Sequence, residues 1–246
     1  MVENMCWTDY LNNRVSFNRT DLRDAFVSDG ICMSPSVFKK ELNKLLDEGK
    51  IARVGRNAYC IPVNEEASYD YTYSQLAEDV ADIMKTNHPF LEFSITELIQ
   101  INEFVNHQIA HNILFLSVED DLKEFVFETL KEKYPGKVLL NPSVELFHQY
   151  WSENMIVIQK LTTEAPRSKK EPWKARLEKL LVDLLTESLW LESIGESELP
   201  TIYEDAFLRY IIDESCLFRY AARRNAEKRI RTFIAEQTTI TLRIKR

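Results

Sequence analysis

The side chains best suited to chemistry in this sequence are cations and amides gathered between residues 34 and 62. This stretch reads SPSVFKKELNKLLDEGKIARVGRNAYCIP and holds six Lys or Arg residues against three Asp or Glu, a net charge of +3. Asn can pair bidentately with adenine, and Lys can reach guanine acceptors or phosphate oxygens. The chemistry indicated is DNA binding. The residues that we expect to contact DNA are Ser36, Lys39, Lys40, Asn43, Lys44, Arg53, Arg56 and Asn57.

A capped amphipathic helix must position the first five of these residues. Ser34 can accept hydrogen bonds from the free N–H groups of a first helical turn, and Pro35 suits the position after it. The spacing of Phe38, Leu42 and Leu45 predicts one buried face. The candidate residues then lie on the opposite, exposed face, at the helix end that a groove-reading helix places against bases.

A short hairpin follows this helix and carries the remaining candidates. The segments IARV and AYCIP predict two strands joined by Gly55-Arg56-Asn57, where Gly and Asn tolerate positive φ. An arginine at such a tip is placed to contact phosphate or the minor groove. Upstream, Thr20 is expected to cap a helix that buries Leu22, Ala25 and Phe26. Helix, turn, helix and hairpin together predict a winged helix-turn-helix.

Two other interpretations of this segment stay open. The charged face could be an ordinary solvated helix surface, and winged-helix units also serve as protein-interaction modules that bind no nucleic acid. The basic residues gather where base and phosphate contacts belong, which favours DNA binding.

The net charge of the whole chain, −8, does not exclude this function because the charge is unevenly distributed. Residues 1–63 hold nine Lys or Arg and eight Asp or Glu, a net of +1, which leaves −9 for the remainder. Exposed charges separated by more than about 8 Å are largely screened at physiological ionic strength. The local patch therefore decides whether phosphate can bind.

The sequence predicts a mixed α+β fold in two domains. The winged helix-turn-helix spans residues 1–63, a polar linker spans 64–73, and an α/β domain that ends in a helical cluster spans 74–246. In the second domain we expect helices near 73–85, 96–104 and 120–132 and after residue 143. Strands are expected near 90–93, at 113–118, at KVLL, at 155–161 and at the terminal TTITLRI.

The composition favours a cytoplasmic protein that folds into globular domains. The sequence has no secretory signal pattern and no uninterrupted apolar run of about 18 residues, so no membrane partner is expected. The four cysteines, Cys6, Cys32, Cys60 and Cys216, are isolated and are expected to be free thiols, mostly buried.

A second basic cluster lies in the otherwise acidic C-terminal domain. It could contact phosphate or an acidic partner, or it could be a solvated helix surface, which is the interpretation that helical surfaces favour. The same alternatives apply to Arg167, Lys169 and Lys170. The cluster consists of Arg219, Arg223, Arg224, Lys228, Arg229 and Arg231.

Catalytic and cofactor motifs give no positive reason to predict an enzyme. His107 and His111 have the spacing of a helical metal pair but lack an H-E-x-x-H context. The carboxylates of 119–121 are expected to stabilise the start of a helix. A metal-dependent nuclease would need an acid in the strand IVIQK, where Ile158 stands. No phosphate-cradling loop or nucleophile elbow occurs, so no cofactor or metal site is expected.

The order helix-turn-helix followed by GKIARVGRNAYCIP resembles the N-terminal domain of AbiEi-like antitoxins, whose wing has a GxIxRVGRGxYxxP-like pattern. Asn57 stands where that family commonly has Gly and can adopt the same left-handed conformation. The segments NHQIAHNILFLSVEDDLKEFVFETL, KVLLNPS, IQKLTTEAP, LEKLLVDLL and LFRYAARRN are similar to the C-terminal part of such proteins.

This resemblance implies a bacterial DNA-binding antitoxin of a type IV toxin–antitoxin, or abortive-infection, module. Such a protein represses transcription of its own operon and counters a nucleotidyltransferase-like toxin encoded beside it. Double-stranded operator DNA and that toxin are therefore the expected partners. The other hypotheses are a winged-helix protein-interaction module without DNA binding and a metal-dependent nuclease.

Overall fold

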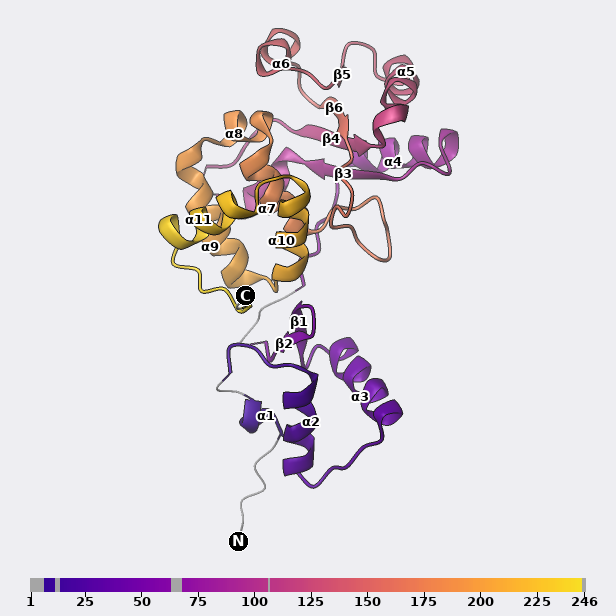
Figure 1. Ribbon diagram of the computed structural model, residues 1–246. Coiled ribbons are helices and arrows are strands. Elements are labelled where there is room, and N and C mark those ends of the chain that lie inside the picture. The colour runs from indigo at the N-terminus through magenta and orange to yellow at the C-terminus, as the bar shows by residue number, and fades with distance from the viewer. Residues whose placement is uncertain (1–6, 12–13, 63–67, 106, 245–246) are drawn as a thin grey trace. The chain divides into compact units, whose positions relative to one another are not determined.

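The computed structural model in Figure 1 describes residues 7–11, 14–62, 68–105 and 107–244, which divide into two compact units. The first unit holds residues 1–68 with the segments 207–216 and 240–246, and the second holds 69–206 and 217–239. The first junction lies inside the linker expected over 64–73. Two segments that we assigned to the domain 74–246 belong instead to the first unit. Residues 64–67 of the linker and Cys6 lie outside the described residues.

The first unit contains a helix-turn-helix and a two-stranded antiparallel hairpin. Its elements are α1 (Trp7–Leu11), α2 (Arg19–Ser28), α3 (Pro35–Asp47), β1 (Ala52–Gly55) and β2 (Ala58–Cys60). Phe17, just before α2, pairs with Tyr59 of β2 through two backbone hydrogen bonds of 2.8 Å. The core is formed by side chains from all three helices and the hairpin, so the helix-turn-helix and the wing fold around one apolar cluster.

The helix caps follow local side-chain chemistry, with one correction. Ser34 caps α3 as predicted, and its Oγ accepts from the N–H of Val37. The prediction of Thr20 as the cap of α2 is wrong, because Asn18 accepts from the N–H groups of Thr20 and Asp21. The carboxylate of Asp21 accepts in turn from the N–H of Asn18 at 2.8 Å. This reciprocal capping box satisfies two free donors and starts the helix two residues earlier.

The second unit is built on a four-stranded sheet with the order β3-β4-β6-β5. Strand β4 runs parallel to β6, β6 runs parallel to β5, and β3 is antiparallel to β4. The strands are β3 (Phe93–Glu97), β4 (Ile113–Val118), β5 (Val138–Leu140) and β6 (Met155–Lys160). The helices are α4 (Gln75–Asn87), α5 (Lys123–Lys133), α6 (Val144–Tyr150), α7 (Leu177–Thr186), α8 (Ser188–Ile194), α9 (Leu199–Arg209), α10 (Glu214–Arg223) and α11 (Glu227–Gln237). The last residues of α9, 207–209, and the first residues of α10, 214–216, belong to the first unit.

Both faces of this sheet are covered, as the uninterrupted burial of β4 indicates. Leu114 and Leu116 belong to a core cluster that includes side chains of α4 and α5. Phe115, which points to the opposite face because side chains alternate along a strand, stacks on Trp190 of α8 with ring centroids 4.7 Å apart. The second unit is therefore a mixed α/β layer that ends in a helical cluster, in agreement with the predicted fold class.

A buried ionic network ties the helical cluster together. Helix α7 is buried from Leu177 to Leu185. The ammonium of Lys179 donates to the carboxylate of Asp183 at 2.5 Å, and both side chains are almost fully buried. The hydroxyl of Tyr220, on α10, donates to the other oxygen of Asp183 at 2.9 Å. Burial and the charge of Asp183 both raise the pKa of Tyr220, so its hydroxyl stays protonated as a donor.

Three element predictions need correction. Strand β3 spans 93–97 rather than 90–93, because its antiparallel pairing with β4 runs from Phe93 to Glu97. The expected helix at 96–104 is a 3-10 turn over Leu98–Glu103. The terminal strand predicted at TTITLRI is absent from the described residues, because carboxylates bind its N–H groups: Glu204 at Thr239, and Glu214 at Arg243 and Ile244.

Among the described residues, none of the helices combines the length and the apolar character that a membrane-spanning helix requires.

The buried pair predicts an asymmetric response to mutation. Asp183→Ala leaves the ammonium of Lys179 without its carboxylate, and we expect it to lower the free energy of unfolding by about 3–5 kcal/mol. Removing the charges together, in Lys179→Met with Asp183→Leu and Tyr220→Phe, should restore most of this loss. Urea denaturation monitored by circular dichroism measures both effects.

The matched control is Asp82→Ala on α4, which removes an exposed i,i+3 partner of Lys85 and should cost under about 1 kcal/mol. If Asp183→Ala were no more destabilising than Asp82→Ala, the network would not stabilise the cluster.

Candidate nucleic-acid interface

Helix α3 divides cleanly between a buried and an exposed face. Phe38, Leu42 and Leu45 are buried in the core of the first unit, as their spacing predicts. The five residues expected to contact DNA from this helix are all exposed: Ser36, Lys39, Lys40, Asn43 and Lys44. Periodicity therefore placed every one of them on the solvent side.

The cations on this face differ in how far neighbouring acids neutralise them. Lys44 lies 3.8 Å from Glu41 and 4.0 Å from Glu48, both exposed or half-buried partners of modest strength. Glu48 also binds Lys50 at 2.9 Å, a hydrogen bond that lowers the pKa of Glu48. Within the described part of the chain, Lys39 and Lys40 form no ion pair, so the charge nearest the start of α3 is the most available to phosphate.

The cationic side chains of the hairpin are exposed, and backbone groups at its turn form hydrogen bonds. Arg53 is exposed, and its Nε donates to the carbonyl of Gly55 at 3.1 Å. The side chain of Arg56 is exposed, but its backbone N–H donates to the Oγ of Ser215 at 3.0 Å. Asn57 has φ of 54°, which confirms the left-handed conformation expected there. Its amide oxygen accepts from the N–H of Arg19, so it links the wing to α2.

The C-terminal segments of the first unit pack against this hairpin. A Cβ at Gly55 would overlap Cδ1 of Ile244, so the absence of a side chain there admits the isoleucine. The buried carboxylate of Glu214 accepts from the N–H groups of Arg243 and Ile244, at 2.7 and 2.9 Å. Ser16 donates to the carbonyl of Arg243 at 2.8 Å. These contacts hold the segment in place beside the wing.

Sequence reasoning missed three residues of this surface. Val37 is 51% exposed on α3 and could contact a thymine methyl group. Arg19, exposed at the start of α2, donates to the hydroxyl of Tyr59 at 3.2 Å. Arg23 of α2 reaches the carbonyl of Met33 at 3.4 Å, in the turn before α3. Because they precede the basic stretch or are apolar, local charge could not single them out.

The second basic cluster does not form one continuous free surface. Arg219 and Arg223 both bind Glu164, at 2.8 and 2.6 Å. Arg231 binds Glu227 and lies over the ring of Phe218, 3.5 Å from its centroid. Lys228 and Arg229 are exposed on α11.

Arg224 differs from the other members of the cluster, because it is half-buried and lines a polar pocket. Arg167 binds Glu92 at 2.7 Å, while Lys169 and Lys170 are exposed.

The residues considered for metal binding or metal-dependent cleavage lie in different parts of the second unit. His107 and His111 lie outside any helix, so the helical face assumed for them does not form. Ile158 pairs with Leu116 and Leu140 in the sheet. Asp120 binds Lys123 and Lys160, and these hydrogen bonds lower its pKa. No group of three or more His, Cys, Asp or Glu that could hold a metal ion occurs among the described residues.

The described cysteines are free thiols. Cys60 and Cys216 are buried, as expected for most of them, whereas Cys32 is exposed in the turn before α3.

The contacts of Glu214 predict a measurable link between the C-terminal segment and the wing. In Glu214→Gln, one carboxylate oxygen becomes an NH2 group that faces one of the two backbone N–H groups, so we expect exchange of either the Arg243 or the Ile244 amide to accelerate about tenfold or more. The amide of Arg56, held by Ser215, should also exchange faster. Hydrogen exchange followed by NMR measures these rates.

Glu204→Gln is the matched control, because Glu204 binds Thr239 of the second unit and should alter that amide without affecting Ile244. Unchanged exchange at both Arg243 and Ile244 in Glu214→Gln would contradict the link.

Comparisons with known proteins place the chain in a family without giving it a function. A sequence profile described as "Family of unknown function (DUF6577)" matches residues 37–240, from within α3 to the C-terminal segment. The curated proteins contain no match. Among solved structures, the chain is similar to the crystal structure of RV2827C protein from Mycobacterium tuberculosis, at 10% identity and a TM-score of 0.25. That match covers 96% of this chain and 83% of the other. Because the family profile covers most of its length, this chain belongs to the DUF6577 family.

Proposed function

We propose that this chain is a cytoplasmic DNA-binding antitoxin that represses transcription of its own operon and counters a nucleotidyltransferase-like toxin encoded nearby. The observation that carries the DNA-binding part is the division of α3. Its apolar face is buried in the core, and its exposed face holds Ser36, Lys39, Lys40, Asn43 and Lys44. A rigid helix with an amide and several cations on its free side is suited to the major groove.

The residues of the first unit have distinct roles in this proposal. Lys40 and Asn43 reach base edges, and Lys39, which forms no ion pair within the described residues, binds phosphate. Arg53 and Arg56 contact the backbone or the minor groove from the wing. Asn57 orients the wing, because its side chain accepts from the N–H of Arg19.

The antitoxin part rests on the resemblance to AbiEi-like proteins across both units. The second unit offers a four-stranded sheet covered on both faces. We assign it the task of countering the toxin, without a catalytic role.

The alternative function is a winged-helix module that docks a protein and binds no DNA. The observation in its favour is the use of the wing as a packing surface, since Gly55 and Arg56 contact Ile244 and Ser215. In that function, the exposed face of α3 would contact a protein partner.

Binding to DNA should depend on Lys40 of α3 and on Arg56 at the turn of the hairpin. We expect Lys40→Ala with Arg56→Ala to weaken binding to the chain's own promoter fragment by about tenfold or more. The dependence of log K on log salt should become less steep by about 1 for each phosphate that the variant no longer neutralises. Fluorescence anisotropy over a salt series measures both quantities.

Lys85→Ala, which removes an exposed, ion-paired lysine of α4, is the matched control and should leave affinity and slope unchanged. Equal affinity in the double variant and the unmodified protein would refute the assignment of these residues.

Toxin neutralisation is tested separately from DNA binding. We expect co-expression of this chain to restore growth of bacteria that express the neighbouring nucleotidyltransferase-like gene. Lys40→Ala with Arg56→Ala should restore growth equally, because the two tasks lie in different units. If neither protein restores growth, the antitoxin assignment is wrong; a stable complex with the neighbouring gene product and no promoter binding would support the docking alternative.

A further inference from the structure

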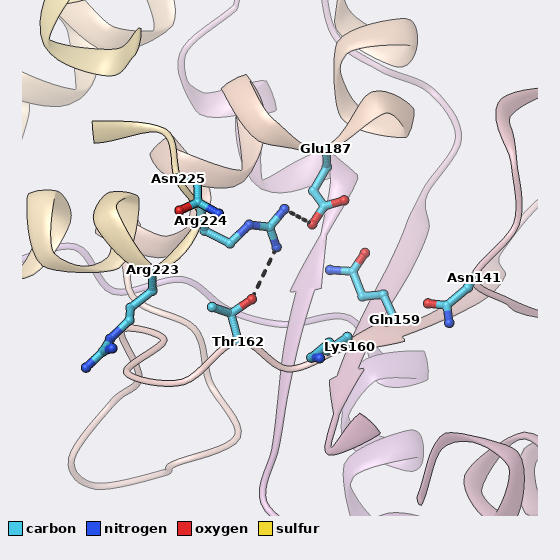
Figure 2. A pocket seen from close by; sticks show the side chains of 8 residues that line it. All are labelled: Asn141, Gln159, Lys160, Thr162, Glu187, Arg223, Arg224 and Asn225. Atoms are coloured by element: carbon cyan, nitrogen blue, oxygen red, sulfur yellow. Dashed lines mark hydrogen bonds and ion pairs between the residues drawn. The ribbon is translucent and has the colours of Figure 1, made fainter. Parts of the chain in front are cut away.

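The second unit contains a polar pocket that the proposed function does not use. It has a volume of about 370 Å³ and is lined by Asn141, Gln159, Lys160, Thr162, Glu187, Arg223, Arg224 and Asn225. These residues come from the end of β5, the end of β6 and the loop after it, the start of α8 and the end of α10. Figure 2 shows the Arg224 side chain extending toward Glu187 and Thr162, and the Arg223 side chain directed away from them.

Arg224 is the anchored cation of this pocket. Its guanidinium binds the carboxylate of Glu187 and lies 3.5 Å from the Oγ1 of Thr162. Burial disfavours the charged form, but the charges of Asp183 and Glu187 outweigh this effect and raise the pKa of Arg224. The side chain is therefore held in one orientation as a permanent positive charge, which reduces the entropy lost when a ligand binds.

Lys160 and Arg223 add exposed positive charge. Lys160 is exposed and binds Asp120 at 3.0 Å, and Arg223 is exposed and binds Glu164 at 2.6 Å. Exposed pairs of this kind contribute little to stability. A doubly charged phosphate can therefore replace the single carboxylate on each cation at small cost, through charge-assisted hydrogen bonds.

Neutral amides complete the lining. Gln159 donates from its Nε2 to the Oγ of Ser117 at 3.2 Å, which fixes its amide plane in the pocket. Asn141 and Asn225 have φ of 41° and 53°, in the left-handed region, and both are exposed residues of the pocket lining. Such amides can donate to and accept from the hydroxyl groups of a ligand.

The position of the pocket in the fold matches that of many ligand sites. Strands β4, β6 and β5 run parallel, and Lys160 and Asn141 lie at the carboxyl ends of β6 and β5. In sheets of this kind, ligands bind outside the carboxyl ends of the strands. The volume also falls within the range of about 300–1,000 Å³ that is usual for small-molecule sites, so phosphate alone would leave most of it empty.

We propose that this pocket binds a small phosphate monoester whose remaining part carries hydroxyl groups, as in a sugar phosphate or a nucleoside monophosphate. Arg224 and Lys160 bind the phosphate, and Asn141, Gln159 and Asn225 bind the hydroxyl-bearing part. The pocket lies wholly in the second unit, so this inference does not depend on DNA binding by α3.

Isothermal titration of the full chain with four probes tests this assignment. Ribose 5-phosphate and adenosine 5′-monophosphate should bind saturably, inorganic phosphate should bind more weakly, and adenosine should not bind. Lys160→Gln should weaken binding of both phosphate monoesters by about tenfold, because it removes one charge-assisted contact. Lys160 is 62% exposed, so this variant keeps the fold, which circular dichroism verifies.

Lys131→Gln is the matched control, since Lys131 is an ion-paired lysine of similar exposure on α5, and it should bind like the unmodified protein. The proposal is overturned if neither phosphate monoester binds saturably or if Lys160→Gln binds them unchanged. It is also overturned if a short single-stranded oligonucleotide binds more tightly than the mononucleotide and loses that affinity in Lys160→Gln, because the cations would then follow a nucleic-acid backbone.

Discussion

The carboxylate of Asp183 is the point on which the second unit depends most. It is fully buried, and its oxygens accept from Lys179 on its own helix and from Tyr220 on α10. Its negative charge also acts on Arg224, four residues after Tyr220, and helps to keep that guanidinium charged. A buried charge is tolerated only when its partners are fixed. The same interaction thus joins two helices across the cluster and sets the cationic side of the pocket.

Local patterns in the sequence were sufficient for elements whose determinants lie within a few residues. Ser34 and the apolar spacing that follows it fix both the start and the buried face of α3, because capping and helical periodicity are local effects. The run from Ile113 to Val118 matches β4 at both ends, since a strand buried on both faces is almost continuously apolar, here with Ser117 as its one polar residue. The same locality explains why the exposed positions of α3 and the left-handed conformation of Asn57 were predicted correctly.

Features set by distant partners could not be predicted in this way. The terminal residues 238–244 have the composition of a strand. The carboxylates of Glu204 and Glu214 nevertheless accept hydrogen bonds from N–H groups of this segment, and these N–H groups are therefore not paired with a neighbouring strand. The pocket joins Lys160 to Arg224, which are brought together by the packing of α10 and not by a motif. The cap of α2 has local determinants but was still predicted wrongly, because Asn18 and Thr20 are both suitable cap residues. Asn18 is the cap in the structure, where the carboxylate of Asp21 accepts from its N–H to complete a capping box.

Ile244 packs against Gly55, so the first unit is built from segments that are far apart in the sequence. A fragment cut after residue 63 would lack the isoleucine and Ser215, leaving an apolar surface and the N–H of Arg56 open to water. Such a fragment would be an incomplete domain, more prone to self-association than the whole protein. An independent form of this unit would have to join its three separate segments through new linkers, and a single truncation cannot produce it.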